Sequence, residues 1–143
     1  MHIEGVKRFA APRERVWDAL VDPELLAGFL PGVQSLDVYD DAHWAALMRL
    51  PHSPVSLTVE FELRERARPE RAVLDARGKR FGAALTAHTA FDLAPDGEET
   101  EMTWAADIDF GGALKRVTPV LRPVAQQQAE RFLDRLNRRL TPS

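Results

Sequence analysis

The chain has 143 residues, of which 45% are hydrophobic and 29% charged, with a formal net charge of −3 and no cysteine. This length suits a single domain, residues 1–143, that can bury a sizeable core. The nearly balanced charge provides no field that would draw the chain to nucleic acid. The lack of cysteine excludes disulfides, thiolate metal sites and thiol catalysis.

The N-terminal residues show no targeting signal. The first five residues, Met1 to Gly5, have neither the basic start nor the apolar run of a signal peptide. No stretch approaches the roughly 18 apolar residues that a membrane span needs. We therefore expect a soluble, cytoplasmic protein.

The N-terminal quarter predicts one strand followed by two short helices. A strand is expected over residues 3–10, and a helix over residues 13–20, whose apolar residues fall on one side. The run Asp22-Pro23-Glu24 predicts a second helix start, because Asp caps free N–H groups and Pro suits a first turn. Pro31-Gly32 then ends this helix.

From Val33 the apolar residues alternate, which predicts six strands. The clearest is the segment 55–64, where Leu57, Val59 and Phe61 face one way and charged residues the other. Short turns, such as Pro95-Asp96-Gly97, join neighbours, so we expect an antiparallel meander. The expected strands cover residues 33–39, 44–50, 55–64, 72–77, 81–93 and 102–110.

After Gly111-Gly112 the apolar residues take helical spacing, which predicts a long C-terminal helix that is clearest over residues 125–140. Thr118 could cap a helix start with Pro119 at its first position. Pro119 and Pro123 interrupt the first half of this helical pattern, since each lacks a backbone N–H. The helical spacing gives one apolar face made of Leu114, Val117, Leu121, Val124, Ala125, Gln128, Phe132, Leu136 and Leu140.

Five stretches of the chain resemble a known superfamily. They are residues 11–20, 22–26, 30–33, 100–104 and 111–112. The chain resembles the helix-grip fold of the START-like superfamily, also called SRPBCC or Bet v 1-like, from the N-terminus to about residue 138. Within it, the chain is similar to the family of the carbon monoxide dehydrogenase G subunit (CoxG). The resemblance implies an α+β fold in which a seven-stranded antiparallel sheet curls around a long C-terminal helix.

The resemblance also implies a function. The expected role is to bind or carry a hydrophobic small molecule, lipid or quinone-like, in a cavity between sheet and helix, in service of a molybdenum hydroxylase or CO dehydrogenase-type redox enzyme. No cofactor is implied. A transient membrane-surface contact is left open, because longer family members continue into a tail thought to reach the membrane. A redox-enzyme protein partner is the other expected partner.

The inward-facing residues suggest where a ligand would lie. Large aromatic residues alternate with alanines, which fits either a cavity or a solid, interdigitated core. Gln128 and Thr89 are the candidates to orient a ligand carbonyl or hydroxyl. The expected ligand-binding residues are Trp44, Met48, Phe61, Phe81, Leu85, Ala87, Thr89, Trp104, Ala106, Leu121, Val124 and Gln128. The expected pocket mouth comprises Phe29, Pro31, Gly32 and Pro119.

No catalytic or metal constellation is expected, so we favour a binding protein over an enzyme. The histidines at 2, 43, 52 and 88 lack metal-ligand spacing. Strand parity places His88, Asp107 and Asp109 on the solvent face, unless a β-bulge reverses it. Two alternatives stay open: a polyketide cyclase or aromatase-like enzyme, which needs an inward ionisable residue, and an assembly factor for a molybdenum hydroxylase that acts through protein contacts.

Overall fold

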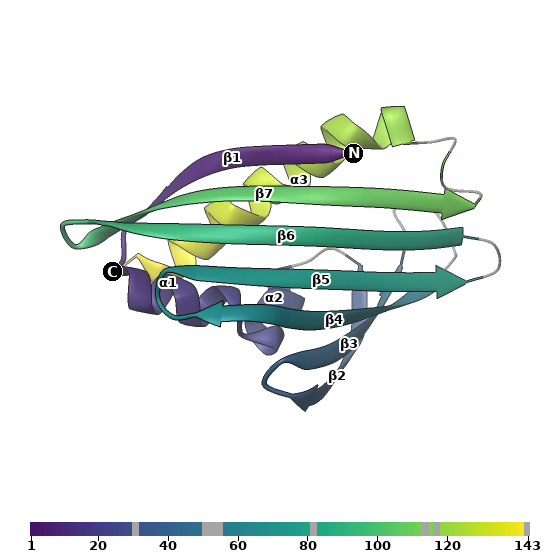
Figure 1. Ribbon diagram of the computed structural model, residues 1–143, viewed down its shortest axis with the longest axis horizontal. Helices are drawn as coiled ribbons and strands as arrows, with labels where there is room; N and C mark the ends of the chain where they lie inside the picture. The colour runs from purple at the N-terminus through teal and green to yellow at the C-terminus, as the bar shows by residue number, and fades with distance from the viewer. Residues whose placement is uncertain (30–31, 50–55, 81–82, 113–114, 116–117, 142–143) are drawn as a thin grey trace.

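The computed structural model describes residues 1–29, 32–49, 56–80, 83–112, 115 and 118–141. Their elements follow the order of strand, two helices, six strands and a final helix (Figure 1). These elements are β1 (His2–Phe9), α1 (Arg13–Leu20), α2 (Pro23–Phe29), β2 (Val33–Asp40), β3 (His43–Arg49), β4 (Ser56–Ala67), β5 (Arg71–Arg80), β6 (Ala83–Asp96), β7 (Glu99–Gly112) and α3 (Thr118–Leu140).

The strands form one antiparallel sheet with α3 packed across one face. The sheet is seven-stranded, in the order β1-β7-β6-β5-β4-β3-β2, so β2 to β7 are the predicted meander. β1 joins the far side of β7. In Figure 1, α3 runs diagonally behind the sheet, and β2 and β3 curl away from the plane of the other strands. The predicted α+β helix-grip architecture is confirmed.

The two short helices begin where the sequence predicts. Asp22 Oδ1 accepts a hydrogen bond of 3.0 Å from the backbone N–H of Glu24, as expected of a helix cap before Pro23. α3 begins at Thr118, the possible start noted in the sequence, and includes both Pro119 and Pro123. A proline at the start of a helix costs little, and Pro123 removes only one hydrogen bond from a helix that is docked on the sheet.

Several strands extend beyond their predicted ends. β6 and β7 continue to the hairpin at Gly97, whose φ of 63° fits a tight turn. The ends of these strands are polar, so the backbone pairing of the strands continues beyond the segment in which apolar residues alternate. Across β5 and β6, for example, Arg71 is paired directly with Asp92 and forms a 2.8 Å ion pair with it.

A solid core fills one end of the space between sheet and helices. There the C-terminal half of α3 packs with α1 and with buried side chains of the sheet. Trp17 of α1 donates its indole N–H to the backbone carbonyl of Arg71 at 3.0 Å. This core contains Phe9, Val16, Trp17, Leu20, Leu63, Leu93, Met102, Leu133, Leu136 and Leu140, none more than 7% exposed.

Polar side chains of α3 fasten the helix along the free edge of β1. Arg122 and Gln126 donate to the backbone carbonyls of His2 and Glu4, at 3.4 and 3.1 Å. Further along, Asn137 Oδ1 accepts a 3.0 Å hydrogen bond from the Ala10 N–H. These bonds satisfy backbone groups that an edge strand would otherwise present to another chain. None of the described helices is long and apolar enough to cross a membrane.

A candidate ligand-binding cavity

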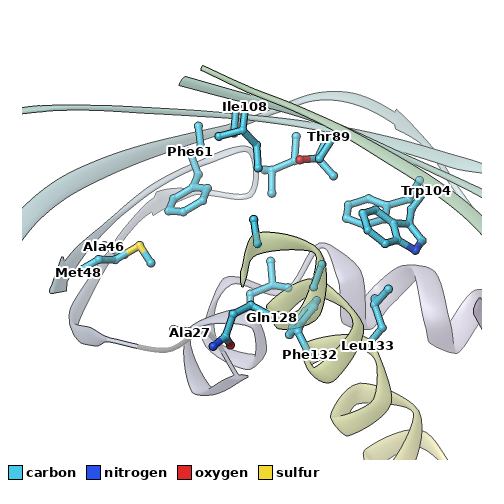
Figure 2. A pocket seen from close by; sticks show the side chains of 18 of the residues that line it. Ala27, Ala46, Met48, Phe61, Thr89, Trp104, Ile108, Gln128, Phe132 and Leu133 are labelled. Atoms are coloured by element: carbon cyan, nitrogen blue, oxygen red, sulfur yellow. The ribbon is translucent and has the colours of Figure 1, made fainter. Parts of the chain in front are cut away.

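A cavity of about 370 Å³ lies between the sheet and α3, beyond the solid core. Its size is within the range of roughly 300–1,000 Å³ that is usual for small-molecule sites. Figure 2 shows side chains of the sheet facing those of α3, with Ala27 of α2 beside them. The lining residues are Ile3, Pro23, Leu26, Ala27, Leu36, Trp44, Ala46, Met48, Phe61, Leu74, Ala76, Ala87, Thr89, Phe91, Trp104, Ala106, Ile108, Ala125, Gln128, Ala129, Phe132 and Leu133.

Two sets of aromatic contacts shape the sheet side of this cavity. Trp44 and Phe61, direct partners on β3 and β4, stack with ring centroids 5.9 Å apart and planes 14° apart. Trp104 on β7 lies across Gly5 of β1, where an added Cβ would come within 2.8 Å of the indole nitrogen. Gly5 therefore gives the Trp104 ring the space that it occupies in the cavity wall.

The lining is apolar apart from Thr89, Gln128 and the indole N–H groups of its tryptophans. No residue that lines the cavity in the described part of the chain carries an acidic, basic or imidazole group. Within the same residues, neither the Thr89 hydroxyl nor the Gln128 amide has a hydrogen-bond partner in the protein. Thr89 comes from the sheet, whereas the amide end of Gln128 extends from α3 toward the α2 side of the cavity (Figure 2).

The structure brings many of the sequence-predicted residues into this wall. The predicted residues that line the cavity are Trp44, Met48, Phe61, Ala87, Thr89, Trp104, Ala106 and Gln128. Their role in binding a ligand stays a prediction. Phe81 and Pro31, together with the side chains of Phe29 and Leu121, lie outside what the structure describes.

Four other predicted residues lie away from the cavity wall. Leu85 borders a separate open depression with Gly78, because the cavity ends at the level of Ala87. Val124 is 43% exposed, since at ~100° per residue it lies far around α3 from the buried stripe. Gly32 accepts a hydrogen bond of 2.7 Å from the Arg49 N–H at the end of β3. Pro119 is exposed in the first turn of α3 and does not line the cavity.

Sequence reasoning missed the contribution of α2 and understated that of the middle of α3. Pro23, Leu26 and Ala27 close one side of the cavity. No pattern in the sequence shows which face of so short a helix turns inward. The α3 stripe was detectable from its spacing of three and four residues, since it consists of Ala125, Gln128, Ala129, Phe132 and Leu133.

The ionisable residues singled out on the strands lie on the outer face. His88 and Asp107 have side chains that are 53% and 63% exposed. Asp109 borders the same open depression on that face as they do. β6 and β7 pair residue by residue without a bulge, so the predicted parity is confirmed.

Solved structures with the same fold are similar to this chain along nearly its whole length. A conserved protein from Geobacillus kaustophilus is 21% identical with a TM-score of 0.87, covering 98% of this chain and 95% of its own. A START superfamily protein from Mycobacterium smegmatis is 15% identical with a TM-score of 0.75, covering 97% and 96%. A protein from Chromobacterium violaceum is 19% identical with a TM-score of 0.72, covering 99% and 98%. Identities this low show the fold alone.

The family itself is shown by sequence. A search of curated proteins gave no match. The model of the CoxG family, that of the carbon monoxide dehydrogenase G subunit, matches residues 5–141, which include every strand at least in part and all three helices. This chain therefore belongs to the carbon monoxide dehydrogenase CoxG family.

Proposed function

We propose that this protein binds and carries a neutral hydrophobic small molecule, lipid or quinone-like, in the cavity between the sheet and α3. The observation that best supports this proposal is a cavity of about 370 Å³ whose described lining has no ionisable side chain. A charged ligand group buried there would lose its hydration without an ionic partner, which is very costly. Thr89 and Gln128 offer hydroxyl and amide groups for one or two ligand oxygens.

The same lining weighs against a cyclase or aromatase. General acid–base catalysis needs a titratable group within hydrogen-bond reach of the reacting atoms. His88, Asp107 and Asp109 border a depression on the outer face and do not line the cavity. Membership of the CoxG family supports service to a CO dehydrogenase-type or molybdenum hydroxylase enzyme, with that enzyme as the protein partner.

A larger side chain that fills the cavity would test whether a ligand binds there. Ala87 of β6 lines one end of the cavity, so the variant Ala87→Trp places an indole in the space that the ligand would occupy. We expect the dissociation constant of the neutral fluorescent probe N-phenyl-1-naphthylamine to rise at least about tenfold, equivalent to ~1.4 kcal/mol. Fluorescence titration gives this constant directly.

The control is Thr103→Trp, which adds the same ring at an exposed position on the outer face of β7. It should leave probe binding unchanged. If Ala87→Trp binds the probe as the unmodified protein does, the cavity is not the binding site. A loss of about 1–3 kcal/mol in unfolding free energy with no change in binding would instead indicate an overpacked solid core.

A further inference from the structure

A continuous row of ionisable side chains crosses all seven strands on the outer face of the sheet. Each member is the direct cross-strand partner of the next, so the row runs perpendicular to the strands. We call this set the outer row; from β1 to β2 it consists of His2, Asp107, His88, Asp75, Glu62, His43 and Asp40. Histidines and carboxylates alternate along it except where Asp75 and Glu62 are neighbours.

At the β1 end, His2 is held between two carboxylates. Its Nδ1 lies 2.7 Å from Asp107 Oδ1, and its Nε2 lies 3.1 Å from Glu4 Oε2. The hydrogen bond to Asp107, followed by that to Glu4, raises the pKa of His2 above 6.5. From α3, the Arg122 guanidinium donates a hydrogen bond of 3.4 Å to the His2 backbone carbonyl. The His2 side chain is 49% exposed, so it exchanges protons freely with solvent.

In the middle of the outer row, His88 lies between Asp75 and Asp107. Its Nδ1 is 2.5 Å from Asp75 Oδ1, and Asp107 is its direct partner on the other side. Arg64 Nη1 also binds Asp75, at 3.0 Å. The other charged groups around His88 in this open depression are Glu62, Arg77 and Asp109.

At the β2 end, His43 lies between Asp40 and Glu62. Its Nδ1 is 2.8 Å from Asp40 Oδ1, and its Nε2 is 4.0 Å from Glu62 Oε1. The remaining ionisable groups around His43 belong to Tyr39, Glu60, Asp75 and Arg77. Among the described residues, no group of three or more His, Asp or Glu side chains could hold a metal ion.

The outer row lies directly behind the cavity wall. In a strand, successive side chains point to opposite faces, so the sequence neighbours of the row face inward except at its β2 end, where Tyr39 beside Asp40 is exposed. Nine of these neighbours line the cavity: Ile3, Trp44, Phe61, Leu74, Ala76, Ala87, Thr89, Ala106 and Ile108. The charges of the outer row and the wall of the cavity are therefore carried by the same backbone segments in six of the seven strands.

The curvature of the sheet determines whether protonation of the outer row flattens the sheet or curls it more tightly. The sheet curls around α3, so the outer row is on its convex side (Figure 1). With protonated histidines, each cation attracts a carboxylate on a neighbouring strand, and attraction across a convex face flattens a sheet. With neutral histidines, carboxylates such as Asp75 and Glu62 repel one another, and tighter curling moves them apart.

We propose that the outer row couples proton binding to ligand binding, so that protonation of its histidines flattens the sheet, widens the cavity and weakens the hold on a hydrophobic ligand. The proposal rests on the proposed function, since it requires a ligand in the cavity. Because linkage is reciprocal, ligand binding must in turn release protons from the outer row.

The test measures the binding of N-phenyl-1-naphthylamine between about pH 5 and pH 8, the interval in which histidines change charge. We expect the dissociation constant to be about fivefold larger at the acid end of this interval. This factor is near the lower limit of the usual coupling between two binding sites, because exposed charges interact weakly. The triple variant His2→Gln, His43→Gln, His88→Gln should abolish this dependence. Thr58→Gln, an exposed outer-face change on β4 beyond the outer row, should retain it.

A second measurement uses the unmodified protein and does not depend on how the triple variant folds. Calorimetric titration with the same probe in buffers of different ionisation enthalpy should show net proton release on binding near pH 6.5, the ordinary pKa of histidine. A pH-independent constant, an opposite slope, or the same slope in the triple variant would overturn the coupling and leave the proposed function intact. Failure of the probe to bind at every pH would overturn both.

Discussion

At the scale of single residues, a test of Gln128 would distinguish a ligand site from an unfilled space beside the core. Gln128 is half-buried on the face of α3 that lines the cavity. The Gln128 amide has no hydrogen-bond partner among the described residues, although the residue lines an apolar cavity. An amide in this position suits a ligand that brings its own carbonyl or hydroxyl oxygen.

Gln128→Leu keeps the size of the side chain and removes its hydrogen bonds. We expect affinity for 2-methyl-1,4-naphthoquinone, which carries two carbonyls, to fall about 3- to 10-fold, the equivalent of one net hydrogen bond of about 0.5–1.5 kcal/mol. Binding of N-phenyl-1-naphthylamine should stay within about twofold. Intrinsic fluorescence quenching follows both ligands. Equal losses for the two probes would show that Gln128 acts through packing alone.

Residue alternation predicted one wall of the cavity well. Trp44, Ala87 and Trp104 lie where strand parity places them, because an antiparallel ladder without bulges fixes which side chains face inward. Leu85 has the same inward parity and yet lies beyond the cavity. Alternation along a strand shows which face of the sheet a side chain is on. It does not show whether the residue lies within the length of the cavity.

At the scale of elements, hydrogen bonds fasten α3 to β1 and to Ala10, the residue that follows this strand. Asn137 accepts the Ala10 N–H at a partly buried position. Asn137→Ala would leave that donor without its acceptor, so we expect the free energy of unfolding to fall by about 1–2 kcal/mol. Urea denaturation measures this change.

Asn137→Asp is the matched control, because a carboxylate oxygen can accept the same hydrogen bond from Ala10. It should retain most of the stability that Asn137→Ala loses. If the two variants are equally destabilised, the Ala10 bond is not the cause. The sequence predicted the existence of each helix and strand, but it could not predict this contact, which joins residues separated by 127 positions.

At the scale of the whole molecule, the protein is solid at one end and hollow at the other. Leu133, Leu136 and Leu140 fill the end of α3 near α1, whereas Ala125 and Ala129 leave space at the other end. The sequence shows large and small residues on the same faces. Whether they interdigitate depends on how far the curved sheet stands from the helix, which no local pattern encodes.

The exposed ion pairs give the whole fold a predicted stability profile with pH. The side chain of Arg68 lowers the pKa of Asp18, while the Ala42 N–H and then His43 lower that of Asp40. Stability from these carboxylates is present above their unfolded value of 3.8 and is lost as the pH falls through their folded pKa. His2 has a raised pKa, so its stability is present below 6.5 and is lost as the pH rises through its folded value.

Urea denaturation across the pH range should therefore show greatest stability between about pH 4 and pH 6.5. His2→Gln should remove part of the decline on the alkaline side and leave the acid side unchanged. Stability that rises steadily from pH 6.5 to 8 in the unmodified protein would contradict the contribution assigned to His2.

Native mass spectrometry of protein purified without detergent is the most direct test of whether the cavity carries a neutral hydrophobic molecule. We expect a discrete added mass that organic solvent extracts as an uncharged, apolar compound, and that is lost in Ala87→Trp. A mass equal to that of the bare chain, unchanged after incubation with quinones and lipids, would contradict the carrier function and favour an assembly factor that acts through its surface.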